Sequence, residues 1–300
     1  MISALLRSMR PKQWSKNLLV FAGYLFTIEK SPSGDFWRVL LAFALFCMIS
    51  GAVYIMNDVM DIEKDRHHPV KCKRPLASGQ VSIGTALTFA LFLAAVAFIA
   101  GFRLNLYFGL SIVAYLLLNF AYTFRFKHVV ILDLLILAGG FVIRAVAGAV
   151  AINVVISPWL LLCTTLLALF LGLAKRRHEI IILEGDAVNH RKILNEYSVM
   201  YLDQMIIITS STALMAYSLY TFSGFSDTAT SHPYMMVTIP FVIYGIFRYL
   251  YLIHTKNAGG RPEQVLLDDK PLLINIVLWA AVVATILKWS DVVNLVQRFF

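Results

Sequence analysis

The chain has 300 residues, of which 59% are hydrophobic and only 14% are charged, and its formal net charge is +9. Soluble domains carry roughly 25% charged residues, so this composition excludes a soluble globular protein and predicts that lipid is the solvent. The positive charge does not require a nucleic-acid partner, because basic residues that flank membrane spans account for it.

Nine apolar runs are predicted to cross a membrane as helices, since about 20 apolar residues in a helix span the hydrocarbon. A short first run covers residues 17–28, and the eight longer runs cover 36–56, 83–102, 104–124, 129–152, 157–174, 201–223, 234–255 and 271–290. The polar segments between the runs are too short to build a soluble core. We therefore expect an all-α polytopic protein that forms a single integral membrane domain over residues 1–300.

The basic residues predict which ends of the spans face the cytoplasm. If the N-terminus is cytoplasmic, 19 of the 26 Lys and Arg residues fall in cytoplasmic segments. This bias sets the orientation by the positive-inside rule. It places the longest polar segments, 57–80, 175–200 and 256–270, on the cytoplasmic side, where we expect the active site.

An acidic cluster ends the second span, where the sequence reads NDVMDIEKDR. In a helix, Asn57, Asp58, Asp61 and Asp65 fall within a wedge of about 100°, whereas Glu63 points away. Clustered carboxylates repel one another, and a hard divalent cation such as Mg²⁺ relieves that repulsion. The pattern therefore predicts a magnesium site, and the alternative is a solvated helix end whose carboxylates pair with nearby cations.

The loop after this cluster reads HHPVKCKRPLASG and adds Lys73 and Arg74, whose side chains are typical phosphate ligands. Carboxylates, a metal ion and basic groups together indicate a diphosphate ligand. Lys16, in the segment that leads into the first span, and Arg66 are further candidates for substrate binding.

Two other cytoplasmic helix ends are basic. The sixth span runs into GLAKRRHEIIILEGD, which predicts a mainly cationic helix end, and the fourth span ends in YTFRFK. Both patterns are also typical of topology signals, and the sequence leaves the two interpretations open. The substrate-binding candidates at these ends are Lys175, Arg176, Glu179, Tyr122, Arg125 and Lys127.

Two arginines lie inside predicted spans. Arg248 lies about two turns inside the eighth span, where a charged side chain is costly and a functional role is the default hypothesis. Arg144 lies deeper in the fifth span and is a second candidate for substrate binding. For each, the alternative is a side chain that extends to the nearest membrane interface.

With these motifs in place, the chain resembles the UbiA superfamily of intramembrane prenyltransferases. That superfamily carries the motif NDxxDxxxD after its second helix, and here the motif runs from Asn57 to Asp65 without a gap. The resemblance implies nine transmembrane helices around a central cavity. The second superfamily motif is usually aspartate-rich, often KDxxDxEGD, whereas the matching stretch here is KRRHE followed later by EGD. This departure argues against a second magnesium–carboxylate site and an ordinary prenyl-diphosphate donor.

The departure resembles one branch of the superfamily, the decaprenyl-phosphate phosphoribosyltransferases. The similarity runs through RPKQWSKN, the acidic cluster, the segment that begins YTFRFK, KRRHE, IPFVIYGIFRYLY and RPEQVLLDDKPLL. It implies Mg²⁺-dependent transfer of 5-phosphoribose from phosphoribosyl diphosphate (PRPP) to a polyprenyl phosphate in a bacterial inner membrane, for synthesis of cell-envelope glycan precursors. By this resemblance Asp58, Asp61 and Asp65, with Asn57, hold Mg²⁺ against the leaving diphosphate, and the basic candidates hold phosphates.

Two other functions stay open at this point. A prenyltransferase that moves a polyprenyl chain from its diphosphate to an aromatic acceptor would share the fold and the first motif. An ion-coupled secondary transporter can also carry an acidic cluster beside membrane helices. The sequence specifies neither the length of the lipid acceptor nor the oligomeric state.

Overall fold

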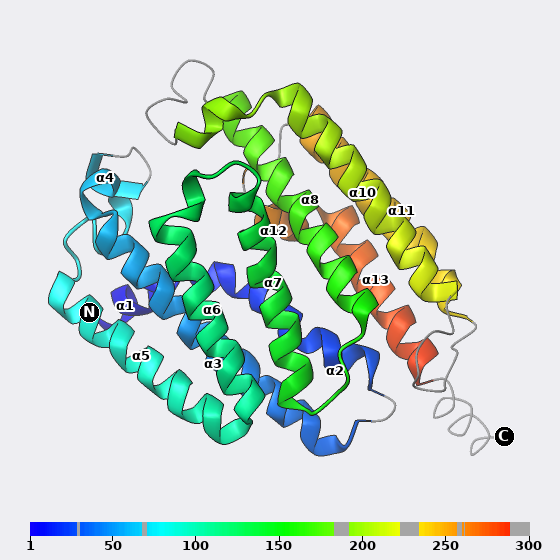
Figure 1. Cartoon of the computed structure of the whole chain (residues 1–300), viewed down its shortest axis with the longest axis horizontal. Coiled ribbons are helices and arrows are strands. Elements are labelled where there is room, and N and C mark those ends of the chain that lie inside the picture. Colours follow the sequence, from blue (N-terminus) through cyan, green and yellow to red (C-terminus); the bar gives the residue numbers. More distant parts are fainter. Residues whose placement is uncertain are drawn as a thin grey trace. The chain divides into compact units, whose positions relative to one another are not determined.

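The computed structural model describes residues 1–28, 31–67, 71–182, 192–222, 234–256, 260 and 262–288. Within these ranges every regular element is a helix, which confirms the all-α prediction (Figure 1). The chain forms two compact units. Unit 1 comprises Met1–Tyr24, Pro32–Phe124 and Ile143–Val155, and unit 2 comprises Leu25–Ser31, Arg125–Val142 and Ile156–Phe300. The single membrane domain stays a prediction.

Eight helical segments in the described ranges are long and apolar enough to cross a membrane, and they match the eight longer predicted runs. The protein is therefore an integral membrane protein. Seven of the segments are single α-helices, and in the remaining one η5 (Met235–Thr238) leads directly into α11. The α-helices are α3 (Ser33–Met60), α5 (Ile83–Leu104), α6 (Leu106–Phe124), α7 (Leu132–Ala151), α8 (Pro158–Ile182), α10 (Val199–Phe222), α11 (Ile239–Thr255) and α13 (Lys270–Leu287).

The predicted first span is built differently from the other eight. Its residues are divided between the 3₁₀-helix η1 (Pro11–Phe21) and the short helix α2 (Ala22–Phe26). A 3₁₀-helix of 11 residues is long for its type, because runs beyond three or four residues are uncommon. The predicted first span is thus not a continuous α-helix of membrane-spanning length.

Unit 1 is built around α3, which packs against α5, and α5 in turn packs against α6 (Figure 1). Phe46 and Ile49 of α3 are buried with Phe108 and Ile112 of α6 in its core. Helix α5 begins where the Ser82 hydroxyl accepts a hydrogen bond from the backbone N–H of Thr85. The remaining elements of this unit are α1 (Ile2–Ser8), α4 (Ile62–His67) and η2 (Lys71–Lys73).

The second half of α7 belongs to unit 1 and packs against η1 at a glycine. A Cβ atom added to Gly148 would lie 1.8 Å from the carbonyl oxygen of Val20. No side chain fits between these two backbones, so glycine is required at this position. This contact fixes the 3₁₀-helix that follows Arg10.

Unit 2 contains the first half of α7 and pairs α8 with α10 and α11 with α13. Leu134, Phe170, Leu202 and Tyr249 are buried together in its core. Helix α13 begins where Asp269 accepts a hydrogen bond from the backbone N–H of Leu272. The short elements of this unit include η3 (Phe126–His128), η4 (Lys192–Glu196) and α12 (Pro262–Asp268).

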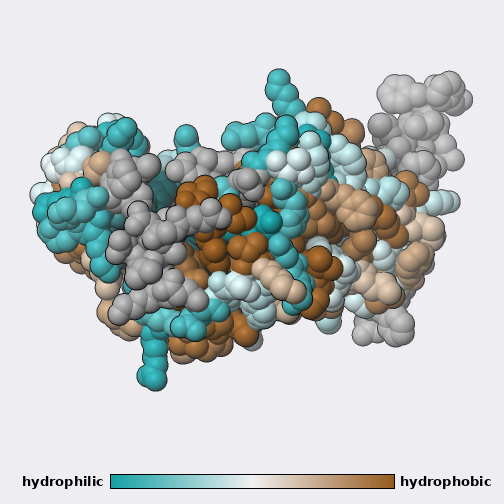
Figure 2. All heavy atoms as spheres, turned by 90° about the horizontal axis from the view of Figure 1, so that it is seen from above, coloured by the Kyte–Doolittle hydropathy of each residue, from teal (hydrophilic) through white to brown (hydrophobic). Residues whose placement is uncertain are grey.

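Large hydrophobic side chains cover much of the outer surface of the helices, as lipid contact requires. On α5, for example, Leu91 and Phe92 are mostly exposed. Figure 2 shows hydrophilic residues, drawn in teal, gathered at the end of unit 1 that carries α4. The acidic cluster belongs to this polar end of unit 1.

Candidate active site

The acidic cluster lies where α3 passes into α4. Helix α3 ends at Met60, and α4 begins at Ile62. Backbone hydrogen bonds from Asp61 to Asn57 (3.0 Å) and from Asp65 to Asp61 (2.8 Å) keep the helical register across this junction. The register places Asp58 and Asp65 on the same side, where both are buried. The shared face is therefore confirmed for these two aspartates, whereas the predicted cluster of three carboxylates is not formed among the residues that the structure describes.

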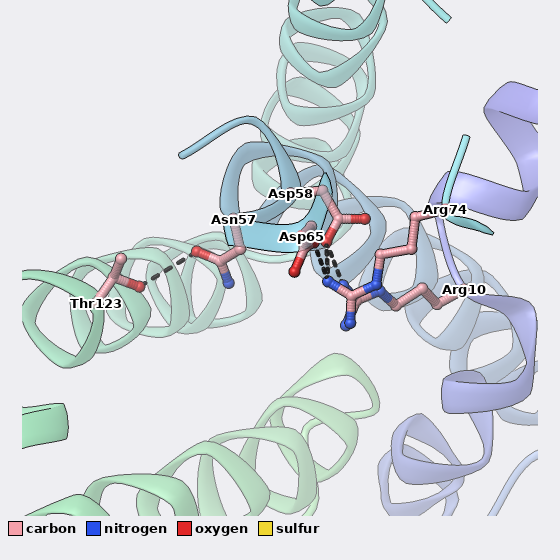
Figure 3. Close-up of polar contacts among 6 residues, drawn as sticks. All are labelled: Arg10, Asn57, Asp58, Asp65, Arg74 and Thr123. Carbon is pink, nitrogen blue, oxygen red and sulfur yellow. Dashed lines mark hydrogen bonds and ion pairs between the residues drawn. The ribbon is translucent and has the colours of Figure 1, made fainter. Parts of the chain in front are cut away.

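Two arginines neutralise the buried aspartates (Figure 3). The Nη1 atom of Arg74 donates to Asp58 Oδ1 at 3.0 Å and to Asp65 Oδ2 at 2.5 Å. Arg10 also donates to Asp58 Oδ1, and its guanidinium lies over the ring of Tyr54. Arg10 has a φ of 54°, a left-handed conformation that is uncommon outside glycine. The sequence predicted Arg74 as a site residue, whereas Arg10 was counted only among the cytoplasmic basic residues and as part of the RPKQWSKN segment of the family resemblance.

The other members of the motif have different environments. The Asn57 amide oxygen accepts a hydrogen bond from the Thr123 hydroxyl of α6 at 3.3 Å (Figure 3). The Asp61 side chain makes no hydrogen bond or ion pair within the described ranges. The Glu63 side chain is 72% exposed and pairs with Arg66 at 2.8 Å, which confirms that it points away from the cluster. Substrate binding by Arg66 stays a prediction.

The remaining candidates of unit 1 are dispersed. Lys73 is exposed in η2, whereas Lys16 of η1 and Tyr122 of α6 are partly buried. Arg144 is buried in the core of the unit, where it donates to Asn17 Oδ1 at 2.7 Å and to the Tyr115 hydroxyl at 2.9 Å. Arg144 thus does not extend to an interface, and its binding role stays a prediction.

In unit 2, Arg176 of the KRRHE segment is paired with two carboxylates. Its Nε atom donates to Asp133 Oδ2 at 3.0 Å, and its Nη1 atom donates to Glu179 Oε2 at 2.6 Å. The side chains of Arg176 and Asp133 are 2% and 0% exposed. A substrate phosphate would have to displace one of these carboxylates, so substrate binding by Arg176 stays a prediction that its contacts do not favour.

The two neighbouring cations of KRRHE also face carboxylates. Arg177 donates to Asp203 Oδ1 at 2.5 Å, and Lys175 Nζ lies 4.0 Å from Glu179 Oε1. The cationic excess predicted for this helix end is therefore offset, partly by aspartates from α7 and α10 that the local sequence does not contain. The EGD residues of the second motif, 184–186, lie outside the described ranges.

The η3 segment of unit 2 contrasts with KRRHE. Arg125 is exposed and Lys127 is partly exposed. Neither side chain has an acidic partner among the residues that the structure describes. These two cations therefore retain their capacity to bind an anion.

Arg248 of α11 is held by a carboxylate of the same unit. Its Nε and Nη2 atoms donate to Asp269 Oδ1 and Oδ2 at 3.1 and 2.9 Å, a bidentate pair. The hydrogen bonds from Arg248 lower the pKa of Asp269 below its ordinary value. The pair ties α11 to the start of α13, and lipid-phosphate binding by Arg248 stays a prediction.

Comparison with known proteins identifies the family. Residues 18–266 match the profile of the UbiA prenyltransferase family. The chain belongs to this family. It is 32% identical over 301 residues to the decaprenyl-phosphate phosphoribosyltransferase of Mycolicibacterium smegmatis, covering 97% of this chain and 94% of that one. It is 33% identical over 280 residues to the enzyme of the same name from Corynebacterium glutamicum, covering 92% and 84% of the two chains.

The fold agrees with solved UbiA structures. A UbiA homologue from Archaeoglobus fulgidus bound to GPP and Mg²⁺ superposes with a TM-score of 0.71, covering 95% of this chain and 99% of that one. Because the two sequences are only 16% identical, the likeness shows the fold alone. In this UbiA chain, the first family motif joins α3 to α4, and the second motif begins at the end of α8.

The structure shows ion-pair partners of the candidate residues that sequence reasoning missed. Arg10, Asp133 and Asp203 each form an ion pair with a candidate or with its immediate neighbour. Asp133 carried a signal that could have been used, because a carboxylate at the start of an apolar run needs a partner. Arg10 carried no such signal, since basic residues before a span are common.

Proposed function

We propose that the chain is a membrane transferase that moves 5-phosphoribose from PRPP to a polyprenyl phosphate and releases diphosphate. The observation that carries the proposal is the similarity to two phosphoribosyltransferases over more than nine-tenths of this chain. The second motif supports the same conclusion, because Arg176 stands where UbiA proteins usually carry an aspartate, and it is paired with the carboxylates of Asp133 and Glu179. The chain thus lacks the aspartate-rich second motif that accompanies a prenyl-diphosphate donor in this family.

The first motif contains the residue types that bind a divalent cation. No group of three or more His, Cys, Asp or Glu residues lies close enough to hold a metal ion in the described ranges. However, Asp58 and Asp65 both contact one nitrogen of Arg74, so a single positive charge already lies between two carboxylates. Carboxylate and amide oxygens are the ligands that Mg²⁺ prefers. Asp58, Asp61 and Asp65, with Asn57, would hold Mg²⁺, which would neutralise charge on the leaving diphosphate.

The residues of the chain do not need to move a proton in this reaction. The bond between the anomeric carbon and the diphosphate oxygen breaks, and its electron pair leaves with the diphosphate. An oxygen of the polyprenyl phosphate forms the new bond to the same carbon. Because that phosphate is already an anion, no general base is required. Arg10 and Arg74, which contact the acidic cluster, add positive charge where the diphosphate leaves.

The other phosphates require cations that are not already neutralised. Taken separately, unit 1 offers Lys73 of η2, and unit 2 offers Arg125 and Lys127 of η3, as cations without an acidic partner within the described ranges. The lipid tail stays in the bilayer, since only the phosphate headgroup needs polar partners. We place the reaction on the cytoplasmic face of a bacterial inner membrane, where the basic segments collect.

One assay separates this function from its main competitor. The purified chain is incubated with PRPP, Mg²⁺ and a panel of polyprenyl phosphates, and the lipids are analysed by mass spectrometry. We expect a product heavier than the acceptor by one phosphoribosyl group, and no product without Mg²⁺. A parallel incubation with polyprenyl diphosphate and 4-hydroxybenzoate should give no prenylated acceptor. Prenylation without phosphoribosylation would overturn the proposal.

A further inference from the structure

The residue directly before α7, Ile131, has a strained backbone conformation. Ile131 has a φ of 69°. The left-handed region is a true outlier for a β-branched residue, because its Cβ approaches the carbonyl oxygen that follows. The Ile131 side chain is 49% exposed, so burial of its apolar surface does not explain the strain. Some other contact must hold this backbone in place.

That contact comes from a buried tyrosine. The backbone N–H of Ile131 donates to the hydroxyl of Tyr197 at 2.7 Å. The same hydroxyl donates to Asp133 Oδ1 at 2.8 Å. Burial raises the pKa of Tyr197 to about 12, so the hydroxyl keeps the proton that it donates. One hydroxyl group therefore fixes the strained backbone relative to the start of α7.

Arg176 completes the network from the end of α8. Its Nε atom donates to Asp133 Oδ2, the oxygen that Tyr197 does not use. All four residues belong to unit 2. Because Asp133 and Arg176 are almost fully buried, removal of either partner would leave an uncompensated charge, and the pair is hard to displace. Arg176, which the sequence predicted to bind the substrate, is thus part of a rigid network that supports the start of α7.

The support is linked through the backbone to η3. The N–H of Asp133 donates to the carbonyl of Val129 at 3.0 Å, and the N–H of Val129 donates to the carbonyl of Phe126 at 3.1 Å. Phe126 stands between Arg125 and Lys127, the two cations of η3 that have no acidic partner within the described ranges. A change in the Ile131 conformation would therefore turn the segment that carries these cations.

We propose that Arg176, Asp133 and Tyr197 are positioning residues that hold Ile131 in its left-handed conformation and thereby aim Arg125 and Lys127 at a phosphate of the donor. This inference rests on the proposed function, since it takes PRPP as the ligand of the η3 cations. It gives the second UbiA motif of this chain a new role, in which Arg176 supports the phosphate-binding segment and does not itself contact the substrate.

The test removes the central hydroxyl and keeps the ring. In Tyr197→Phe we expect the KM for PRPP to rise about ten-fold, as loss of a hydrogen bond to a charged group implies, while kcat changes less than about two-fold. Tyr201→Phe is the matched control. Its ring stacks on Tyr197 at 6.1 Å, and its hydroxyl has no hydrogen-bond partner within the described ranges. The control should leave KM and kcat unchanged.

A second variant tests the strain directly. Glycine adopts a positive φ without the penalty of isoleucine, so Ile131→Gly should reduce the need for the tyrosine hydroxyl. We expect the KM of the double variant Tyr197→Phe/Ile131→Gly to lie within about three-fold of Ile131→Gly alone. If Tyr197→Phe raises the KM by the same factor in the Ile131→Gly background as in the parent chain, the strain argument is contradicted. Because the Ile131 side chain is 49% exposed, a change in packing at this residue would not explain a rescue of the KM by Ile131→Gly.

A third measurement does not depend on turnover. Trypsin cleaves after Arg125 and Lys127, so the rate of cleavage at these two residues reports how firmly η3 is held. We expect cleavage about ten-fold faster in Tyr197→Phe, the parent rate in Tyr201→Phe, and an intermediate rate in the double variant. If the single variant Tyr197→Phe does not fold, the cleavage rates of Ile131→Gly and of the double variant Tyr197→Phe/Ile131→Gly are compared instead.

The outcomes separate the two proposals. If the parent chain transfers no phosphoribose, the proposed function fails, and the cleavage rates alone decide whether the support exists. If Tyr197→Phe matches Tyr201→Phe in cleavage and in KM, the positioning role is overturned. A fall in kcat with an unchanged KM, not rescued by Ile131→Gly, would assign Tyr197 to general packing and overturn it as well.

Discussion

Asp61 differs from the other two aspartates of the first motif in its contacts. Asp58 and Asp65 share Arg74, whereas the Asp61 carboxylate has no partner within the described ranges. Asp61→Asn should therefore lower kcat by at least about 100-fold, because a metal ligand is lost, without lowering thermal stability. Asp58→Asn should lower both, since it breaks the ion pairs with Arg10 and Arg74. Turnover and the melting temperature of the purified variants provide the measurement.

Glu63→Gln is the matched control for Asp61→Asn. Glu63 lies in the same acidic stretch, but its carboxylate is exposed, and among the described residues its one ion-pair partner is Arg66. Exposed pairs contribute little to stability, so neither turnover nor melting temperature should change measurably. Equal losses of activity at Glu63 and Asp61 would refute the assignment of the metal ligands.

The Arg248–Asp269 pair predicts a pH dependence of stability. The folded state lowers the pKa of Asp269 below its ordinary value of 3.8, chiefly through the hydrogen bonds from Arg248. The carboxylate therefore contributes stability that is fully present above pH 3.8 and is lost as the pH falls through the lower, folded value. We expect the melting temperature of the parent chain to be higher than that of Asp269→Asn at neutral pH. This difference in melting temperature should vanish in acid. A difference that persists below the folded pKa would exclude the ion pair as its cause.

For single residues, the sequence predicted the candidate site residues better than it predicted the side chains that form ion pairs with them. The spacing of the first motif predicted the shared side of Asp58 and Asp65 and the outward direction of Glu63. It could not predict Arg10 or Asp133, because ion pairs between residues 48 and 43 positions apart depend on tertiary packing. The charge of KRRHE was overestimated for the same reason.

Among the elements, the contact between η1 and α7 gives a sharp prediction. A Cβ at Gly148 would collide with the carbonyl oxygen of Val20, and backbone atoms cannot move aside as a flexible side chain can. Gly148→Ala should therefore destabilise the protein by about 1–3 kcal/mol, although the same change usually stabilises a helix. The melting temperature in detergent measures this effect.

Gly84→Ala is the matched control in a second membrane helix of the same unit. Nothing lies within 4 Å of a Cβ built on Gly84, which stands in the first turn of α5. Here the helix propensity of alanine should dominate and raise stability by up to about 1 kcal/mol. If both glycine variants shift the melting temperature in the same direction, the close backbone contact does not decide the outcome.

The elements themselves were largely predictable. The eight longer apolar runs correspond to eight helical segments, among the residues that the structure describes, that are long and apolar enough to cross a membrane. Length and hydropathy leave few alternatives in lipid. The first run did not become one α-helix. Its 3₁₀ geometry depends on Pro11, on the left-handed Arg10 and on contact with Gly148, and only the first of these is visible as a local signal.

For the whole molecule, the orientation in the membrane can be tested within unit 1. We expect a cysteine at exposed Ser78 to react with a membrane-impermeant maleimide only in inside-out vesicles, in a background that lacks Cys72 and Cys163. A cysteine at Val155, which is 80% exposed beyond the end of α7, should react only from the opposite side. The expectation follows from the basic residues that collect beside the acidic cluster. Reaction of both thiols from one side would contradict the topology.

The buried pair of Asp133 and Arg176 also has a consequence for how the chain is made. The aspartate is synthesised 43 residues before its arginine, which at 5–20 residues per second corresponds to about 2–9 s of translation. Asp133 therefore leaves the ribosome earlier than Arg176 by the same interval, and until Arg176 follows, its carboxylate cannot be neutralised by α8. The two helices are therefore best inserted together as a hairpin, and a nascent chain that stops before Arg176 would present the unpaired acid to the quality-control proteases of the membrane.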